Sequence, residues 1–372
     1  MTVYCGVDFH ARQQTLAYCH TQDGEIKFLQ LQHEDRAALQ RFYTQLPPPV
    51  VVGLEAGGYS DWFERWLAAR GIEVQVGNPA EIRRRARSRQ KNDWRDAELL
   101  LDLLLKDEFP RIQRHAADSQ MVLGQLRYRH KLVQLRTRVT NALHALAIRE
   151  GLCLRSALLS QAGRAKLKAL ALTPAQVQQR DEWLALIDQL SDNIKRVERE
   201  LTKLAAQDTQ VKRVRTHPGI GLLTGLALVH TLKPVSRFAN GRKVTAYVGL
   251  EPREYSSDTK QRWGGISTAG SSLLRFLLIE AAQQAARADA ELKNTYQHLS
   301  ARRGRPKAKV AVARKLLVRA YILMRDEIDY ATYLRRTVAV GRPGYSPERL
   351  ASSDASLTRP LIGRPTALGQ PV

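Results

Sequence analysis

The stretch VVVGLEAGG, residues 50–58, predicts a buried β-strand that ends in an acidic side chain and a glycine turn. A short, continuous apolar run bounded by glycine is typical of a strand that is covered on both faces of a sheet. The first charged residue after that run is Glu55. Functional side chains of α/β sheets collect at the carboxyl ends of the strands. The stretch therefore predicts an α/β sheet with Glu55 at its functional edge.

The segments on either side extend this sheet. Apolar residues alternate at Val3, Cys5 and Val7, which predicts an opening strand, and Asp8 follows at its end. The pattern also predicts strands at 14–20, 27–30 and 73–76 and helices at about 35–46 and 61–70. Three strands followed by an alternation of helix and strand indicate a layered α/β domain.

A pair of aspartates joins the two acids at the strand ends. The segment KNDWRDA, residues 91–97, places Asp93 and Asp96 three residues apart at the start of a predicted helix, so both lie on one face. Each acid has an ordinary alternative as a helix-capping or surface residue. Together, Asp8, Glu55, Asp93 and Asp96 predict a site for two Mg²⁺ ions about 3.5–4 Å apart, which would act on a phosphodiester.

The charge of the chain indicates a polyanionic partner. The 372 residues carry a formal net charge of +23, which favours nucleic acid first and an anionic membrane second. The basic run RRRARSRQK, residues 83–91, precedes the paired aspartates, and a solvated charged face is its alternative. No apolar run reaches about 18 residues and the first residues lack a signal-peptide pattern, so we expect a cytoplasmic protein that does not enter a membrane.

Two long helices are predicted in the middle of the chain, at about 119–150 and 176–206. Their apolar residues step by four and three, beginning with Tyr128, Leu132 and Leu135 in the first helix. Such a repeat favours left-handed pairing of helices. The two helices can pair with each other as an antiparallel hairpin or with the same helices of another copy, and the sequence leaves both alternatives open.

The second candidate site is the stretch YSSDTKQRWGGISTAGSSLLR, residues 255–275. It combines hydroxyls, cations and glycines ahead of a predicted helix, a composition suited to contact with a phosphate. Upstream, HPGIG at 217–221 is similar to a helix-hairpin-helix element that binds phosphate through glycine amides. Downstream, residues 301–325 hold basic side chains and no acid, which predicts a basic loop at 302–307 and a helix with a phosphate-facing side.

With these motifs in view, the chain resembles the insertion-sequence transposases of the DEDD type, a family of serine recombinases guided by a structured bridge RNA. The segments that carry the resemblance are GVDFH, GLEAGGYS, KNDWRDAELL, HPGIG, RFANGRKVTAYVGLEPREYSS and GGISTAGSSLLRFLL, in this order along the chain. The resemblance implies an α/β RNase H-like (RuvC-like) domain at 1–114, a helical coiled-coil region at 115–210 and a mostly α transposase domain at 211–337. The remaining residues, 338–372, are rich in Pro, Gly and Ser and predict a disordered tail.

The resemblance also implies roles for single residues. Asp8, Glu55, Asp93 and Asp96 match the four acidic positions of the family, and the nucleophile falls on Ser257, with Ser256 as the alternative. Many relatives carry glycine after the serine pair, whereas this chain has Asp258.

The implied reaction is a Mg²⁺-dependent attack of a serine hydroxyl on a DNA phosphodiester, which forms a phosphoserine link and retains the bond energy for rejoining. The implied partners are DNA, a structured non-coding guide RNA and further copies of the chain in a dimer or tetramer. Two other functions fit the residues. One is a metal-dependent nuclease or junction resolvase of the RNase H fold that uses water, and the other is a non-catalytic protein that binds nucleic acid.

Overall fold

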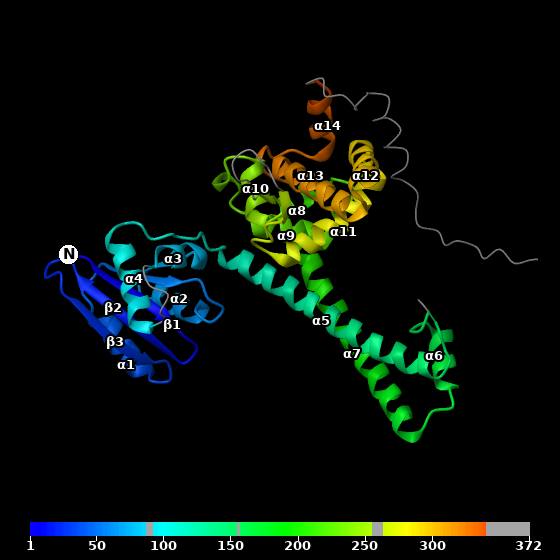
Figure 1. Cartoon of the computed structure of the whole chain (residues 1–372), viewed down its shortest axis with the longest axis horizontal. Coiled ribbons are helices and arrows are strands. Elements are labelled where there is room, and N and C mark those ends of the chain that lie inside the picture. The colour runs from blue at the N-terminus through cyan, green and yellow to red at the C-terminus, as the bar shows by residue number, and fades with distance from the viewer. Residues whose placement is uncertain (87–91, 155–156, 255–262, 340–372) are drawn as a thin grey trace, which may run out of the picture. The chain divides into compact units, whose positions relative to one another are not determined.

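The computed structural model describes residues 1–86, 92–154, 157–254 and 263–339 (Figure 1). The chain divides into two compact units, Met1–Arg114 and His115–Val372. The predicted nucleophile Ser257, its alternative Ser256 and the predicted tail beyond residue 339 lie outside the described residues. No helix in the described part of the chain is long and apolar enough to span a membrane.

The first unit is built on a five-stranded sheet in the order β3-β2-β1-β4-β5. The strands are β1 (Val3–Phe9), β2 (Gln13–His20), β3 (Ile26–Gln32), β4 (Val50–Glu55) and β5 (Glu73–Gly77). β1, β2 and β3 pair antiparallel, and β1 pairs parallel with β4, which pairs parallel with β5. This mixed α/β organisation confirms the coarse prediction from sequence.

Four helices accompany the sheet: α1 (Arg36–Gln45), α2 (Asp61–Ala68), α3 (Pro79–Arg85) and α4 (Asp93–Leu105). α1 and α2 share a buried core with Val3, Cys5 and Val7 of β1. α4 packs on the other face, where a Cβ on Gly6 would lie 2.3 Å from the carbonyl oxygen of Ala97. Only glycine permits this approach, which holds the middle of α4 against the middle of β1.

The second unit is mostly helical. Its elements are α5 (Ala117–Arg149), α6 (Gln161–Lys168), α7 (Pro174–Gln207), α8 (Thr209–Val214), α9 (Leu222–Leu232), the 3₁₀ turn η1 (Val235–Arg237), α10 (Gly241–Val248), β6 (Pro252–Glu254), β7 (Trp263–Ile266), α11 (Ser272–Ala288), α12 (Ala290–Arg303), α13 (Arg305–Arg325) and α14 (Tyr330–Ala339). The strand pair β6–β7 and the helix α6 have no counterpart in the sequence predictions.

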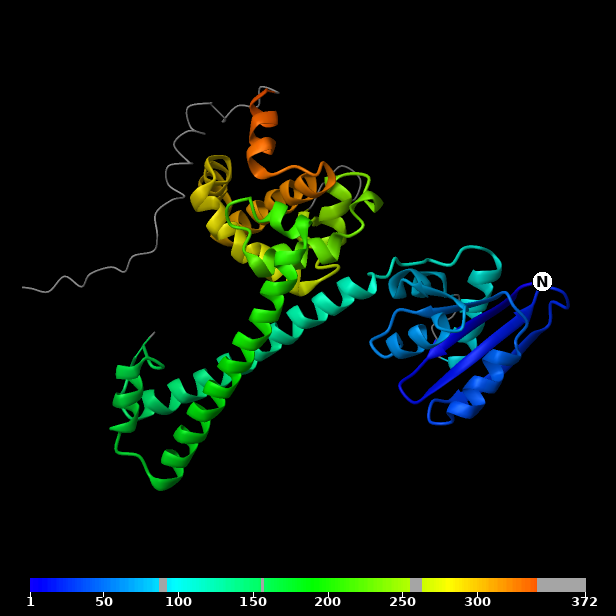
Figure 2. The ribbon, with the colours of Figure 1, turned by 180° about the vertical axis from the view of Figure 1, so that it is seen from behind.

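The helices α5 and α7 form an antiparallel hairpin within the chain, as both views in Figures 1 and 2 show. Arg129 near the start of α5 pairs with Glu198 near the end of α7 at 2.6 Å. The antiparallel hairpin, one of the two pairings that the heptads left open, is therefore present in the structure. Tyr128 and Leu135, which the heptad pattern placed in the seam, are 48% and 38% exposed. A single partner helix covers only a narrow stripe of α5, and these two side chains lie beside that stripe.

The basic segment near the C-terminus differs from its prediction in two ways. The predicted loop at 302–307 is helical except for Gly304, a left-handed residue (φ 82°) that separates α12 from α13. The basic side chains expected to give this helix a phosphate-facing side include Arg319, which is instead buried and pairs with Asp289 at 2.8 Å. A buried guanidinium needs such a partner, because an unpaired charge in the interior is costly.

Gly219 of the HPGIG segment is a packing residue. Its φ is 94°, and a Cβ would lie 2.6 Å from the backbone nitrogen of Ala285 in α11. Gly219→Ala should therefore lower the free energy of unfolding of the second unit by about 3 kcal/mol or more, since the substitution adds backbone strain to overpacking. Urea denaturation followed by circular dichroism measures the change.

Gly221→Ala is the matched control, because nothing lies within 4 Å of the added Cβ and the backbone of Gly221 is extended. We expect that change to cost about 1 kcal/mol or less. Equal costs for the two alanine variants would show that Gly219 is not tightly packed.

Candidate active site

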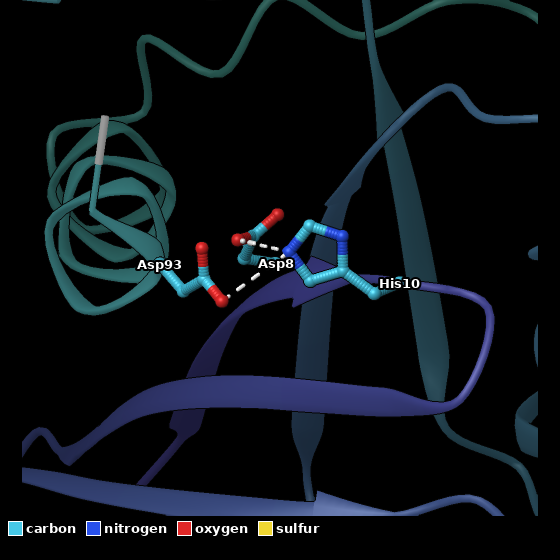
Figure 3. Close-up of side chains that lie close together, drawn as sticks. All are labelled: Asp8, His10 and Asp93. Atoms are coloured by element: carbon cyan, nitrogen blue, oxygen red, sulfur yellow. Dashed lines mark hydrogen bonds and ion pairs between the residues drawn. The ribbon is translucent and has the colours of Figure 1, made fainter.

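Three side chains of the first unit converge at the carboxyl end of β1 (Figure 3). His10 Nε2 lies 3.1 Å from Asp8 Oδ2 and 3.5 Å from Asp93 Oδ2. One ligand atom from each of the three residues falls within 4.8 Å of the other two. All three side chains are partly exposed, so a ligand can reach them from solvent.

The local fold explains why Asp8 and Asp93 meet. Asp8 points to the same face of β1 as Gly6, because side chains two apart in a strand share a face. α4 lies against Gly6 on that face. The side chain of Asn92 caps α4 by accepting a hydrogen bond from the Trp94 amide, which sets Asp93 in the first turn. The first turn of α4 therefore carries Asp93 to Asp8.

Asp96 and Glu55 lie outside the closest group of donors. Burial raises the pKa of Asp8, His10 lowers it, and the charges of Asp93 and Asp96 raise it, so Asp96 acts on Asp8 through its field. Glu55 is the last residue of β4. The register pairs Val7 of β1 with Leu54 of β4, so Asp8 and Glu55 each follow a paired residue on neighbouring strands. The Glu55 carboxylate lies 3.7 Å from the guanidinium of Arg83, an exposed pair of little strength.

His10 belongs to this site and Thr15 lies opposite Asp8 on the neighbouring strand, and sequence reasoning missed both. Thr15 pairs with Asp8 across β1 and β2, so its side chain shares the face of Asp8. Thr15 is fully buried, and its Oγ1 has no hydrogen-bond partner among the described residues. His10 stands two residues after Asp8, a spacing that is a recognisable signal only when a metal site is already expected at that strand end.

The donor set fits a divalent cation. Carboxylate oxygens suit Mg²⁺ and Mn²⁺, and an imidazole nitrogen is accepted by Mn²⁺ more readily than by Mg²⁺. The negative charges of Asp8 and Asp93 are close together and only partly solvated, an arrangement that a cation stabilises.

The strand pair β6–β7 holds the two ends of the predicted serine loop in the second unit. Pro252 pairs with Ile266 and Glu254 with Trp263. Arg253 donates a hydrogen bond to the carbonyl of Ser267 at 2.9 Å, which joins β6 to the segment after β7. Ser256 and Ser257 belong to residues 255–262 between the strands, outside the described residues.

Two transposase family models match the chain. Residues 5–148 match a transposase model named for the DEDD transposases of IS110 type, and residues 211–297 match the model described as Transposase IS116/IS110/IS902 family. The first match covers Asp8, Glu55, Asp93 and Asp96, and the second covers the strand pair and the predicted serine loop.

Several curated proteins are similar over most of their length. The chain is 29% identical to the putative transposase y4pF/y4sB of Sinorhizobium fredii, over 79% of this chain and 78% of that protein. It is 28% identical to the transposase for insertion sequence element IS1328 of Yersinia enterocolitica, over 72% and 79% of the two chains. It is 28% identical to the transposase for insertion sequence element IS1111A of Coxiella burnetii, over 71% and 74%. These matches show that the chain is similar to the DEDD transposases of the IS110/IS116 family, over segments that include the acidic site.

Proposed function

We propose that this transposase cleaves and rejoins DNA at a divalent-metal centre formed by Asp8, Glu55, Asp93 and Asp96, with His10 as a further ligand. The observation that carries the proposal is the convergence of donor atoms from Asp8, His10 and Asp93 within 4.8 Å. Mg²⁺ is the cation of the working enzyme. When bound, it supplies a Lewis acid for a phosphoryl oxygen. His10 positions the carboxylates of Asp8 and Asp93 through its Nε2 contacts, and Thr15 adds a buried hydroxyl on the strand next to Asp8.

We assign the first unit to the RNase H-like (RuvC-like) fold class. The strand order β3-β2-β1-β4-β5, with three antiparallel strands leading into two parallel ones, supports this assignment. The match of residues 5–148 to the DEDD model supports it too. In the second unit, we propose that 115–210 serves as a helical coiled-coil region and 211–337 as the domain that carries the nucleophile.

The nucleophile of the proposed reaction is Ser257, with Ser256 as the alternative. Its Oγ forms a bond to phosphorus while the bond from phosphorus to the neighbouring sugar oxygen breaks. The proton of the hydroxyl leaves to solvent, and the departing sugar oxygen gains a proton. The phosphoserine ester keeps a phosphodiester bond, so the reverse attack by a new sugar hydroxyl rejoins DNA without an added energy source.

Hydrolysis by water is the second candidate function. The cluster of Asp8, His10 and Asp93 lies wholly within the first unit, and its donor types suit a metal-dependent nuclease or resolvase that uses no residue of the second unit. That reaction leaves free cut ends and uses no serine.

The proposed partners follow from charge and family. A net charge of +23 supports binding of DNA and of a structured guide RNA, both polyanions. Base pairing of the RNA would select the DNA sequence, while the protein contacts backbone and shape. We also propose assembly of several copies, as a dimer or tetramer.

A covalent-adduct assay separates the two reactions. The purified chain is incubated with Mg²⁺, DNA spanning the element junction and RNA transcribed from the non-coding end of the element, and the products are run on a denaturing gel. We expect the wild type and Ser256→Ala to form a protein–DNA adduct. We expect Ser257→Ala to form none. Cleaved DNA without any adduct would replace the serine reaction with hydrolysis by water.

A further inference from the structure

A basic cavity lies in the second unit, beside the segment that follows the strand pair β6–β7. Its volume is about 500 Å³. Its walls come from α5, α9, α10 and the start of α11, elements that lie together in both Figures 1 and 2. The lining includes Arg127, His130 and Lys131 of α5 and contains no acidic residue among those described. The acidic site of the first unit shares none of these residues.

The two strongest charges of the cavity are available to a ligand. Arg127 and Lys131 stand four residues apart on α5, so both project from the same face of the helix. Both side chains are exposed at the surface. Neither forms an ion pair with the carboxylates of the described residues, in contrast to Arg129 on the same helix, which pairs with Glu198. Two cations on one face without a counter-charge favour an anion.

The start of α11 completes the anion-binding character of the cavity. Gly270, Ser271, Ser272 and Leu273 line it, and α11 runs for 17 residues from Ser272. The Ser271 hydroxyl caps the helix by accepting a hydrogen bond from the Leu274 amide. The amides of the first turn of a helix point outward at its start and carry a partial positive charge, which suits a phosphate oxygen.

An unpaired hydroxyl gives independent support. Thr231 of α9 lines the cavity and is only 4% exposed. Its Oγ1 makes no hydrogen bond to any described residue. A buried polar atom without a partner is uncommon and is usually satisfied by water or a ligand. Thr231 can donate its proton to an anionic oxygen that enters the cavity.

We propose that this cavity binds a phosphodiester of the DNA strand, with Arg127, Lys131, Thr231 and the first-turn amides of α11 as its partners. The inference rests on the proposed function, because DNA is the substrate, and it names a subsite for that substrate. The chain passes from β7 (Trp263–Ile266) to Ser272 in a few residues, so the cavity lies close along the chain to the predicted serine loop. A backbone phosphate held here would fix the position of the strand relative to that loop.

The test is the salt dependence of DNA binding, measured in EDTA so that no cleavage occurs. A fluorescein-labelled DNA duplex, its single strand and an RNA of the same sequence are titrated with the wild type and with the double variant Arg127→Gln/Lys131→Gln. We expect the DNA affinity of the double variant to fall about tenfold at near-physiological salt. The slope of log K against log salt should become smaller by about 0.9, which corresponds to one phosphate.

Two further variants make the result specific. Arg138→Gln removes an exposed charge from the same helix outside the lining of the cavity, and it should leave the slope unchanged. Thr231→Val keeps the shape of the side chain and removes only the hydroxyl, so it should weaken binding about fivefold with no change in slope. Thermal unfolding of each variant reports whether the fold is retained.

The outcomes separate this site from the proposed function. If the double variant and Arg138→Gln lose equal affinity, or if only RNA binding weakens, the cavity is not a DNA subsite, although the transposase function stands. If the wild type itself binds no DNA, the proposed function fails together with the site. A loss of DNA affinity and slope confined to the cavity variants supports the subsite.

Discussion

Asp8→Asn should reduce DNA cleavage about 10³-fold or more, which corresponds to a loss of about 4 kcal/mol in transition-state stabilisation. Asparagine has nearly the same shape, so it fits the end of β1 beside His10. It removes the negative charge and replaces one carboxylate oxygen with an amide nitrogen, which cannot ligate a cation, in the carboxyl group that lies 3.1 Å from His10 Nε2. Rates of Mg²⁺-dependent cleavage of junction DNA in the presence of the RNA measure the effect.

Asp102→Asn is the matched control for that variant. Asp102 lies on α4, the helix that carries Asp93, but it is exposed and pairs with Lys106 at 2.7 Å, away from the acid cluster. An exposed pair of this kind contributes little, so the control should cleave DNA within about twofold of the wild type. Cleavage by Asp8→Asn within tenfold of the wild type would contradict the role of Asp8 at the metal centre.

Asp289→Ala should lower the free energy of unfolding of the second unit by about 3–5 kcal/mol. Asp289 is buried, and its carboxylate accepts hydrogen bonds from Arg319 at 2.8 Å, from the Tyr330 hydroxyl and from the Leu292 amide at the start of α12. Burial alone would raise its pKa, but these partners, Arg319 first, hold the pKa below its ordinary value. Alanine would leave the buried charge of Arg319 without this partner.

Urea denaturation measures this loss, and Asp192→Ala is its control. Asp192 forms an exposed pair with Lys195 on α7 at 3.3 Å, so its removal should cost less than about 1 kcal/mol. The double variant Asp289→Ala/Arg319→Met should regain more than half of the loss, because an apolar side chain replaces a buried guanidinium that has lost its buried carboxylate partner. A cost below about 1 kcal/mol for Asp289→Ala would show that the buried pair does not support the packing of α12 and α13.

Local patterns were sufficient to predict the sheet. The apolar run before Glu55 and the alternation before Asp8 each correspond to a strand, β4 and β1, because burial on a sheet imposes these periods directly on the sequence. The predicted helix start at Asp93 is also confirmed, and the cap by Asn92 that sets it is a local interaction. The proximity of Asp8 and Asp93 depends in addition on one non-local contact, that of α4 with Gly6.

Features that depend on packing could not be read from the sequence. The burial of Arg319 depends on Asp289, thirty residues away along the chain. The exposure of Tyr128 and Leu135 depends on how much of α5 a single partner helix covers. His10 follows β1, and its side chain turns back toward Asp8 at the end of that strand. Hydrophobic periodicity does not predict such a turn. The cavity beside α11 likewise joins Thr231 to Arg127 and Lys131 only in the folded chain.

The most direct test of the metal centre is Mn²⁺ binding followed by electron paramagnetic resonance, with the wild type, Asp8→Asn, His10→Gln and Asp102→Asn. We predict that the wild type and Asp102→Asn bind Mn²⁺ with equal affinity and that Asp8→Asn binds it at least about 100-fold more weakly. We also predict that the bound ion shows coupling to a nitrogen nucleus, and that His10→Gln abolishes this coupling. Equal Mn²⁺ affinity in the wild type and Asp8→Asn would contradict a metal centre at the end of β1.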